Sequence, residues 1–68
     1  MRLEDAKNNI GNRVRYIPAS WKEDIGNAPI EYGIITGYNY KYIFVRYTSD
    51  VNSKATSPED LSLLFNNW

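Results

Sequence analysis

The side chains that most often carry catalysis are missing from this sequence, which contains no His and no Cys. General acid–base catalysis near neutral pH usually depends on His, and nucleophilic catalysis depends on Ser or Cys beside a base. The acidic residues include three adjacent pairs, Glu4-Asp5, Glu23-Asp24 and Glu59-Asp60. Neighbouring side chains point apart on a strand and to different sides of a helix, so these pairs do not converge. The residue types therefore favour a protein that binds and is not an enzyme.

Metal and cofactor sites lack their usual ligands as well. A zinc site needs Cys or His, and a calcium loop needs regularly spaced oxygen ligands that no segment supplies. The four glycines are scattered along the chain and do not form a phosphate-binding loop. We therefore expect no cofactor and no metal.

Aromatic residues give the strongest binding signal. Six Tyr, two Trp and two Phe make up 15% of the chain, which is more than a small core can hide with every hydroxyl bonded. Aromatic residues together with Arg are enriched at interface hot spots. The predicted protein-binding residues are Trp21, Tyr40, Tyr42, Phe44 and Arg46. An alternative interpretation packs Phe44 under an N-terminal helix or against an opposing sheet.

Two other ligands fit parts of the same set. Single-stranded nucleic acid suits aromatic rings beside cations, because bases stack on rings while cations track phosphates. Its predicted contacts are Arg13, Arg15, Lys41 and Arg46. Eight basic and eight acidic residues cancel, which weighs against a ligand that is attracted by accumulated positive charge.

The third possible ligand is a methylated cation held in an aromatic cage of Tyr16, Trp21 and Tyr47. The alternation of residues instead directs Tyr16 and Tyr47 toward the core.

The elements that position these residues must share one modest core. The chain has 68 residues, of which 43% are apolar, and this size predicts a single domain over 1–68. Leu3, Ala6 and Ile10 have helical spacing before Gly11, which predicts a short N-terminal helix within 1–10 that lays Leu3 and Ile10 against the sheet. So short a helix is stable only when it packs on another element, and we expect it to close one end of the fold.

Alternating residues predict the strands. Polar and apolar residues alternate over 12–17, and Pro18 ends that strand before a loop over 18–29. The segments 30–36 and 42–48 are rich in β-branched and aromatic residues, and the five residues between them suit a tight hairpin. In the second strand Ile43, Val45 and Tyr47 share the core face, while Arg46 places its own face outside.

The C-terminal third predicts a turn over 50–53, a short strand over 54–56, one helical turn and a last strand. Ser57 is expected to cap the helical turn, because Pro58 suits the first helical position and two acidic residues follow it. The last strand is expected to begin at Leu61 and could continue through Phe65. The pattern does not place Trp68.

Together these elements predict a mainly β fold: a small five-stranded SH3-like barrel with a short N-terminal helix and one helical turn before the last strand. Three segments, Glu31-Tyr32-Gly33-Ile34-Ile35, Ile43-Phe44-Val45-Arg46-Tyr47 and Ala55-Thr56-Ser57-Pro58-Glu59-Asp60-Leu61, resemble small SH3-like barrel proteins of bacteriophages and prophages. The resemblance covers about Ile10 to Leu64. The same order is similar to Tudor, KOW and CAP-Gly domains, which supports the fold. It assigns no functional residue.

Location and assembly follow from composition and from the resemblance. The start of the chain turns acidic at once, no segment approaches the ~20 apolar residues of a membrane span, and cysteine is missing. We expect a cytoplasmic protein, in a bacterial host cell if the chain is phage-encoded, with a partner protein and no membrane contact. A small barrel with an imperfectly closed edge could also pair with its copy, so a monomer and a weak homo-oligomer both stay open.

Overall fold

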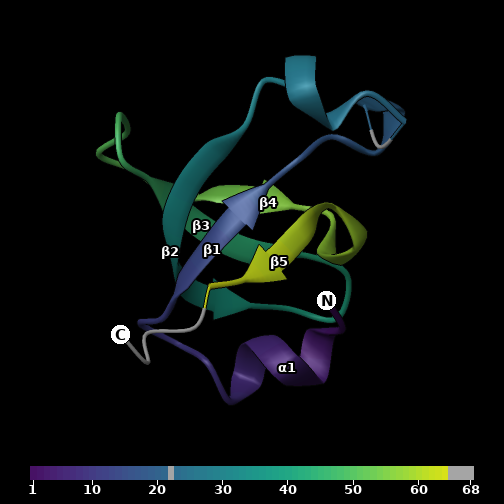
Figure 1. The fold of residues 1–68 in the computed structure, drawn as a ribbon. Helices are drawn as coiled ribbons and strands as arrows, with labels where there is room; N and C mark the ends of the chain where they lie inside the picture. The colour runs from purple at the N-terminus through teal and green to yellow at the C-terminus, as the bar shows by residue number, and fades with distance from the viewer. Residues whose placement is uncertain (22, 65–68) are drawn as a thin grey trace.

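The computed structural model describes residues 1–21 and 23–64, and it contains one antiparallel sheet of five short strands (Figure 1). The strands are β1 (Arg13–Tyr16), β2 (Glu31–Tyr38), β3 (Ile43–Tyr47), β4 (Lys54–Thr56) and β5 (Leu61–Leu63), in the spatial order β4-β3-β2-β1-β5. Helix α1 (Leu3–Lys7) lies beside the sheet, and the 3-10 turn η3 (Pro58–Asp60) precedes β5. The predicted five-stranded SH3-like barrel, with its short N-terminal helix and its helical turn before the last strand, is confirmed.

The core lies on the concave side of the curved sheet. It is built from one apolar face of each long strand, closed by α1 and β5. Its buried members are Ala6, Val14, Ile35, Ile43, Val45, Tyr47 and Leu61, with Met1, Leu3, Tyr16 and Leu63 packed around them. The predicted core face of β3 is confirmed, because Ile43, Val45 and Tyr47 are all buried.

Helix α1 is shorter than the predicted 1–10 segment. Two asparagine side chains after the helix donate hydrogen bonds to carbonyl groups in its last turn, from Asn8 Nδ2 to Glu4 O (3.3 Å) and from Asn9 Nδ2 to Asp5 O (2.6 Å). These bonds occupy acceptors that a longer helix would use for its backbone. The helix therefore buries Ala6 and packs Leu3 on the core, whereas Ile10 lies beyond it and is 48% exposed. The prediction that Ile10 packs against the sheet is wrong.

Strand β2 ends two residues later than predicted, and it contains a bulge. Ile35 pairs with Val45, but Gly37 pairs with Phe44, so Thr36 is an extra residue on β2. A bulge of this kind bends a strand and increases its twist. The hairpin turn therefore spans 39–42 rather than 37–41, and the Asn39 side chain accepts hydrogen bonds from the backbone N–H groups of Lys41 (2.8 Å) and Tyr42 (2.6 Å).

Close approach of β2 and β3 depends on Gly33. A Cβ atom at this position would lie 2.6 Å from Val45 Cγ1 and 2.8 Å from the Arg46 carbonyl oxygen. No side chain fits there without displacing backbone, so the missing side chain lets β3 pass close across β2.

The connection between β1 and β2 is long, whereas the connection between β4 and β5 is short. The segment between β1 and β2 projects beyond the sheet (Figure 1) and contains two 3-10 turns, η1 (Ala19–Trp21) and η2 (Ile25–Asn27). The segment before β5 is tight: Ser57 holds the predicted cap position of η3 and Pro58 follows it, but the Ser57 hydroxyl makes no capping hydrogen bond.

Phe65 and Trp68 lie outside the described residues. No helix in the described part of the chain has the length and apolar character needed to cross a bilayer.

Candidate functional site

The convex outer face of the sheet is formed by the residues that alternate with the core. Val14, Ile35 and Val45 are fully buried on the inner side of β1, β2 and β3. Their neighbours Arg13, Ile34 and Arg46 therefore face outward, and the pairing of the strands sets Arg13 beside Ile34 and Ile34 beside Arg46. Because adjacent strands lie about 4.8 Å apart, the two arginine backbones are about 10 Å apart on either side of Ile34.

A second row lies one step along the same face. Arg15 pairs with Tyr32 on one side and with Ser62 on the other. The Tyr32 side chain is 48% exposed, and its carbonyl oxygen accepts a hydrogen bond from the backbone N–H of Thr48 (3.1 Å). Arg15 is half-buried, and its Nε atom has no hydrogen-bond partner among the described residues.

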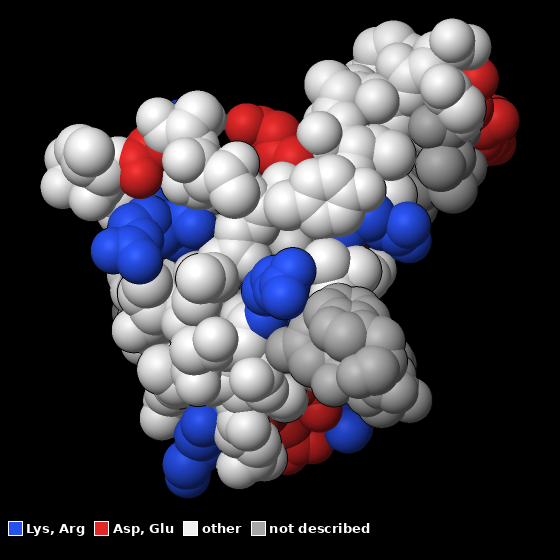
Figure 2. All heavy atoms as spheres, turned by 60° about the vertical axis from the view of Figure 1, so that its left-hand side comes forward, with Lys and Arg blue, Asp and Glu red and all other residues white. Residues whose placement is uncertain are grey.

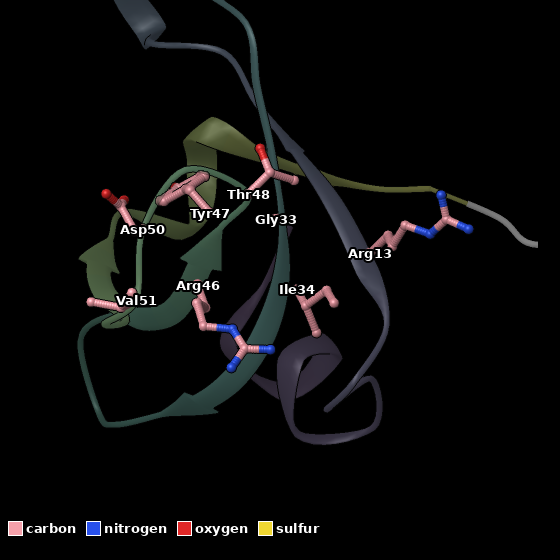
Figure 3. Close-up of a pocket in the computed structure, with 8 residues that line it drawn as sticks. All are labelled: Arg13, Gly33, Ile34, Arg46, Tyr47, Thr48, Asp50 and Val51. Atoms are coloured by element: carbon pink, nitrogen blue, oxygen red, sulfur yellow. The ribbon is translucent and has the colours of Figure 1, made fainter.

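A groove of about 450 Å³ borders the first row (Figure 3). We call it the outer groove. Its lining residues are Arg13, Gly33, Ile34, Arg46, Tyr47, Thr48, Asp50 and Val51. In Figure 3 the Arg46 side chain extends toward Ile34, while the Arg13 guanidinium points away from Ile34. The outer groove thus combines an exposed cation with an aliphatic surface.

The loop between β3 and β4 forms one wall of the outer groove and is anchored at several points. The Asp50 backbone N–H donates to Tyr47 O (2.9 Å), and Asp50 Oδ2 lies 3.2 Å from Lys54 Nζ, an ion pair without hydrogen-bond alignment. Thr36 Oγ1 donates to Phe44 O (3.2 Å) and lies 2.6 Å from Ser53 Oγ. Since the Thr36 hydroxyl carries one hydrogen, Ser53 is the donor in that second contact. The wall is therefore held by β2, β3 and β4 together.

The predicted protein-binding residues fall into three separate places. Phe44 and Arg46 lie on the outer face, where Phe44 is half-buried and its Cδ2 atom lies 3.7 Å from the position of a Cβ on Gly37. Tyr40 and Tyr42 lie in the turn between β2 and β3, and Tyr40 is 89% exposed. Trp21 lies in η1, before β2, so the eight residues of β2 separate it from that turn. The structure does not gather all five residues into one patch.

The residues predicted to contact nucleic acid are more closely grouped. Arg13, Arg15 and Arg46 share the outer face. Lys41 lies in the hairpin turn, where its Nζ atom is 5.3 Å from the centre of the Tyr42 ring. Figure 2 shows one side of the molecule, on which basic side chains form separate groups among uncharged ones, and acidic side chains lie along the upper edge and near the lower end. The arginines therefore form a local basic face and not a continuous basic surface.

Tyr16 and Tyr47 form part of the core, as their alternation predicted. Their rings meet edge to face with centroids 5.9 Å apart. The Tyr47 hydroxyl lies 2.8 Å from Thr56 Oγ1, and the Tyr47 side chain is only 5% exposed. Burial, as the largest cause, raises the pKa of Tyr47, while the hydrogen bond to Thr56 acts in the opposite direction. Tyr47 therefore fills the core and does not offer an open face to a cation.

Three apolar or aromatic side chains at this surface were not assigned to a site from the sequence: Ile34 and Val51, which line the outer groove, and Tyr32, which lies beside it. Tyr32 and Ile34 could have been found from the alternation in 31–35, because Gly33 and Ile35 occupy the inner positions. Val51, which is 89% exposed, belongs to a turn, and no periodic pattern predicts its place. Among residues 1–21 and 23–64, acidic side chains do not gather in groups of three or more that could hold a metal ion.

Comparison with known proteins adds no assignment. No family model, curated protein or solved structure matches the chain.

Proposed function

We propose that this protein is a non-enzymatic binding module that engages a partner protein through the outer groove and the adjoining Tyr32. The observation that carries the proposal is the cross-strand row of Arg13, Ile34 and Arg46 beside a groove of about 450 Å³. Arginine and tyrosine are the residue types that dominate binding energy at protein interfaces, and a buried aliphatic centre excludes water around them. The outer face supplies all three.

Binding without chemistry agrees with the residues present. The outer groove contains no nucleophile beside a base, and its one carboxylate, Asp50, is paired with Lys54. The resemblance of the sequence to phage and prophage proteins supports a bacterial partner. An affinity experiment with bacterial lysate is therefore the appropriate test.

The test compares the partners recovered by the wild type with those recovered by Tyr32→Ala/Arg46→Ala. We expect the double substitution to reduce recovery of a specific partner about tenfold or more, because two hot-spot side chains are lost. The matched control is Tyr38→Ala/Lys7→Ala, which also removes one exposed tyrosine and one exposed cation, but outside the outer groove. The control should recover the partner as the wild type does.

Two results would contradict the proposed site. The first is equal recovery by the wild type and the Tyr32→Ala/Arg46→Ala protein. The second is a loss confined to a Tyr40→Ala/Tyr42→Ala variant, which would place the interface on the hairpin turn. Circular dichroism of each variant establishes that the fold is intact before recovery is compared.

Nucleic acid is the second candidate, and one observation favours it: Arg13, Arg15 and Arg46 gather on one face although the chain carries no net charge. Binding by phosphate contacts weakens steeply as the salt concentration rises. An oligonucleotide should therefore bind at low salt, and Arg13→Glu/Arg15→Glu should abolish that binding. Retention of the oligonucleotide by this variant would remove the candidate.

A further inference from the structure

We propose that the segment recognised by the outer groove is an extended acidic peptide in which carboxylates flank an apolar side chain. This inference rests on the proposed function, because it specifies the chemistry of the partner at the same surface. Four features of the surface support it: the exposed Arg46, the aliphatic residues beside it, the charge balance of the groove and the geometry of the strands.

Arg46 is available to a ligand in the outer groove. It is exposed, and within the described chain no hydrogen bond or ion pair holds its guanidinium. Its side chain extends over the outer groove toward Ile34 (Figure 3). A guanidinium presents paired N–H groups whose geometry matches a carboxylate, and such bonds are the stronger ones because both partners are charged. The complementary group on a ligand is therefore a carboxylate.

The surface next to Arg46 is aliphatic. Ile34 is half-buried in the face of the sheet, and Val51 stands almost fully exposed on the opposite wall. A ligand that supplied only carboxylates would leave these two side chains in water. An apolar side chain inserted between Ile34 and Val51 would bury both, which is the favourable contribution that charge alone does not provide.

The charge balance of the groove selects against a basic ligand. Asp50 is the only acidic residue among the lining residues, and Lys54 lies 3.2 Å from its Oδ2 atom. Arg13 and Arg46 line the groove, and Arg15 follows on the same face. Because the whole molecule is neutral, this attraction acts at short range and depends on the ligand lying in the groove.

An extended ligand fits the spacing of these groups. Side chains at alternate positions of an extended chain lie on one face and are about 6.7 Å apart. Ile34 and Arg46 are direct cross-strand neighbours, about 5 Å apart between their Cα atoms. An apolar side chain over Ile34 therefore places a carboxylate two residues away within reach of the Arg46 side chain.

The experiment is a titration of the 15N-labelled protein, followed by backbone amide shifts. The first probe is the blocked peptide Gly-Ser-Asp-Ser-Leu-Ser-Asp-Ser-Gly. Two comparison peptides carry Lys in place of both Asp residues, or Ser in place of Leu, and a fourth probe is a ten-nucleotide oligothymidylate. We expect the first peptide to shift the amides of Ile34, Arg46, Thr48 and Val51, and both comparison peptides to bind at least about fivefold more weakly.

Variants identify the residue responsible. Arg46→Ala should weaken binding of the acidic peptide about fivefold or more, whereas Lys7→Ala, which removes one exposed cation on α1, should leave it within about twofold. Arg46→Lys keeps the charge but loses the paired N–H geometry, so it should fall between the two.

Three results overturn the inference: no shifts at the groove with the acidic peptide, equal binding of the Lys peptide, or tighter binding of the oligothymidylate at the same amides. The proposed function is tested separately, by adding the acidic peptide to the affinity experiment. If the captured partner depends on Tyr32 and Arg46 but the peptide does not displace it, the inferred ligand chemistry is wrong and the binding site stands. If recovery does not depend on those residues, the binding site itself is wrong.

Discussion

Strand β3 has two faces that differ in nearly every physical property. On the inner face Ile43, Val45 and Tyr47 are buried, and the one polar group, the Tyr47 hydroxyl, is bonded to Thr56. On the outer face Arg46 is exposed and without a partner in the described chain, beside an open groove. The two faces belong to the same five residues and differ by a single step along the chain.

This difference between the two faces means that inner residues mainly determine folding stability and outer residues mainly determine binding. Inner positions are restricted by neighbours on every side, so their substitution should cost folding free energy. Outer positions are half-buried or exposed, so their substitution should mainly change what the protein binds. For 68 residues a total stability of about 3–10 kcal/mol is usual, and losses on the inner face are large relative to that total.

The largest expected contrast compares two adjacent isoleucines. Ile35→Ala should lower the free energy of unfolding by about 2–5 kcal/mol, because it removes a fully buried side chain and leaves a cavity. Ile34→Ala, one residue earlier on the outer face, should cost about 1 kcal/mol or less. Urea denaturation of both variants measures the difference. Equal losses would mean that Ile34 is as tightly packed as Ile35, and the outer face would then not be a free surface.

The next contrast compares two glycines of β2. Gly33→Ala should cost about 1–3 kcal/mol, because its Cβ would meet the Arg46 carbonyl oxygen and Tyr47 Cα, which are backbone atoms that cannot rotate away. At Gly37 a Cβ would only touch the Phe44 ring, at 3.7 Å, and neither glycine has a positive φ. Gly37→Ala should therefore be neutral, or stabilising by up to about 1 kcal/mol, through the unfolded state. Thermal melts of the two variants that coincide would contradict the close approach of β2 and β3.

A smaller effect concerns the polar group of the inner face. Tyr47→Phe removes the hydrogen bond to Thr56 and should cost about 1 kcal/mol at neutral pH, since Thr56 Oγ1 keeps a contact with Lys54 O (3.4 Å). The raised pKa of Tyr47 adds a pH dependence. The stabilisation it provides is complete below the unfolded value near pH 10 and is lost as the pH rises through the folded pKa.

Urea denaturation at pH 8 and above pH 10 separates the two contributions. Wild-type stability should fall more steeply than that of Tyr47→Phe between these values. At the higher pH the Tyr47 hydroxyl ionises more readily in the unfolded chain than in the fold, which favours unfolding. The Tyr47→Phe protein has no such group. The other five tyrosines are present in both proteins and cancel. Parallel losses would show that the Tyr47 hydroxyl does not resist ionisation in the fold.

Local patterns predicted the inner face better than the outer one. The period of two over 43–47 fixes which residues of β3 enter the core, and the Ser57-Pro58 step marks the turn before β5. The bulge at Thr36 depends on hydrogen bonds to Phe44 and Ser53, which are distant in the sequence. Strand periodicity cannot reveal such contacts, so the limits of the hairpin turn were displaced.

The candidate site was predicted in part for the same reason. Arg46 and the two arginines of β1 follow from alternation, and they do share one face. The separation of Trp21 from Tyr40 follows from topology, because they lie in segments before and after β2. The place of Val51 in the groove wall follows from the conformation of the loop between β3 and β4. Neither feature has a local signal in the sequence.

The smallest expected effect concerns Arg15, which is half-buried on the outer face and whose Nε atom has no hydrogen-bond partner among the described residues. An unsatisfied buried donor weakens the fold, and replacing it with an apolar side chain of similar length removes that cost. Arg15→Met should therefore leave the free energy of unfolding unchanged or raise it by up to about 1 kcal/mol, as urea denaturation can measure.

Arg15→Gln is the control, because it shortens the side chain and removes its charge but keeps a polar group that still needs a partner. If Arg15→Met lowers the free energy of unfolding by more than about 1 kcal/mol, the arginine is a structural residue, and the outer face then resembles the inner face in contributing to stability. If stability is kept while partner recovery falls, a residue that does not help the fold helps binding, which is the combination expected of a functional surface.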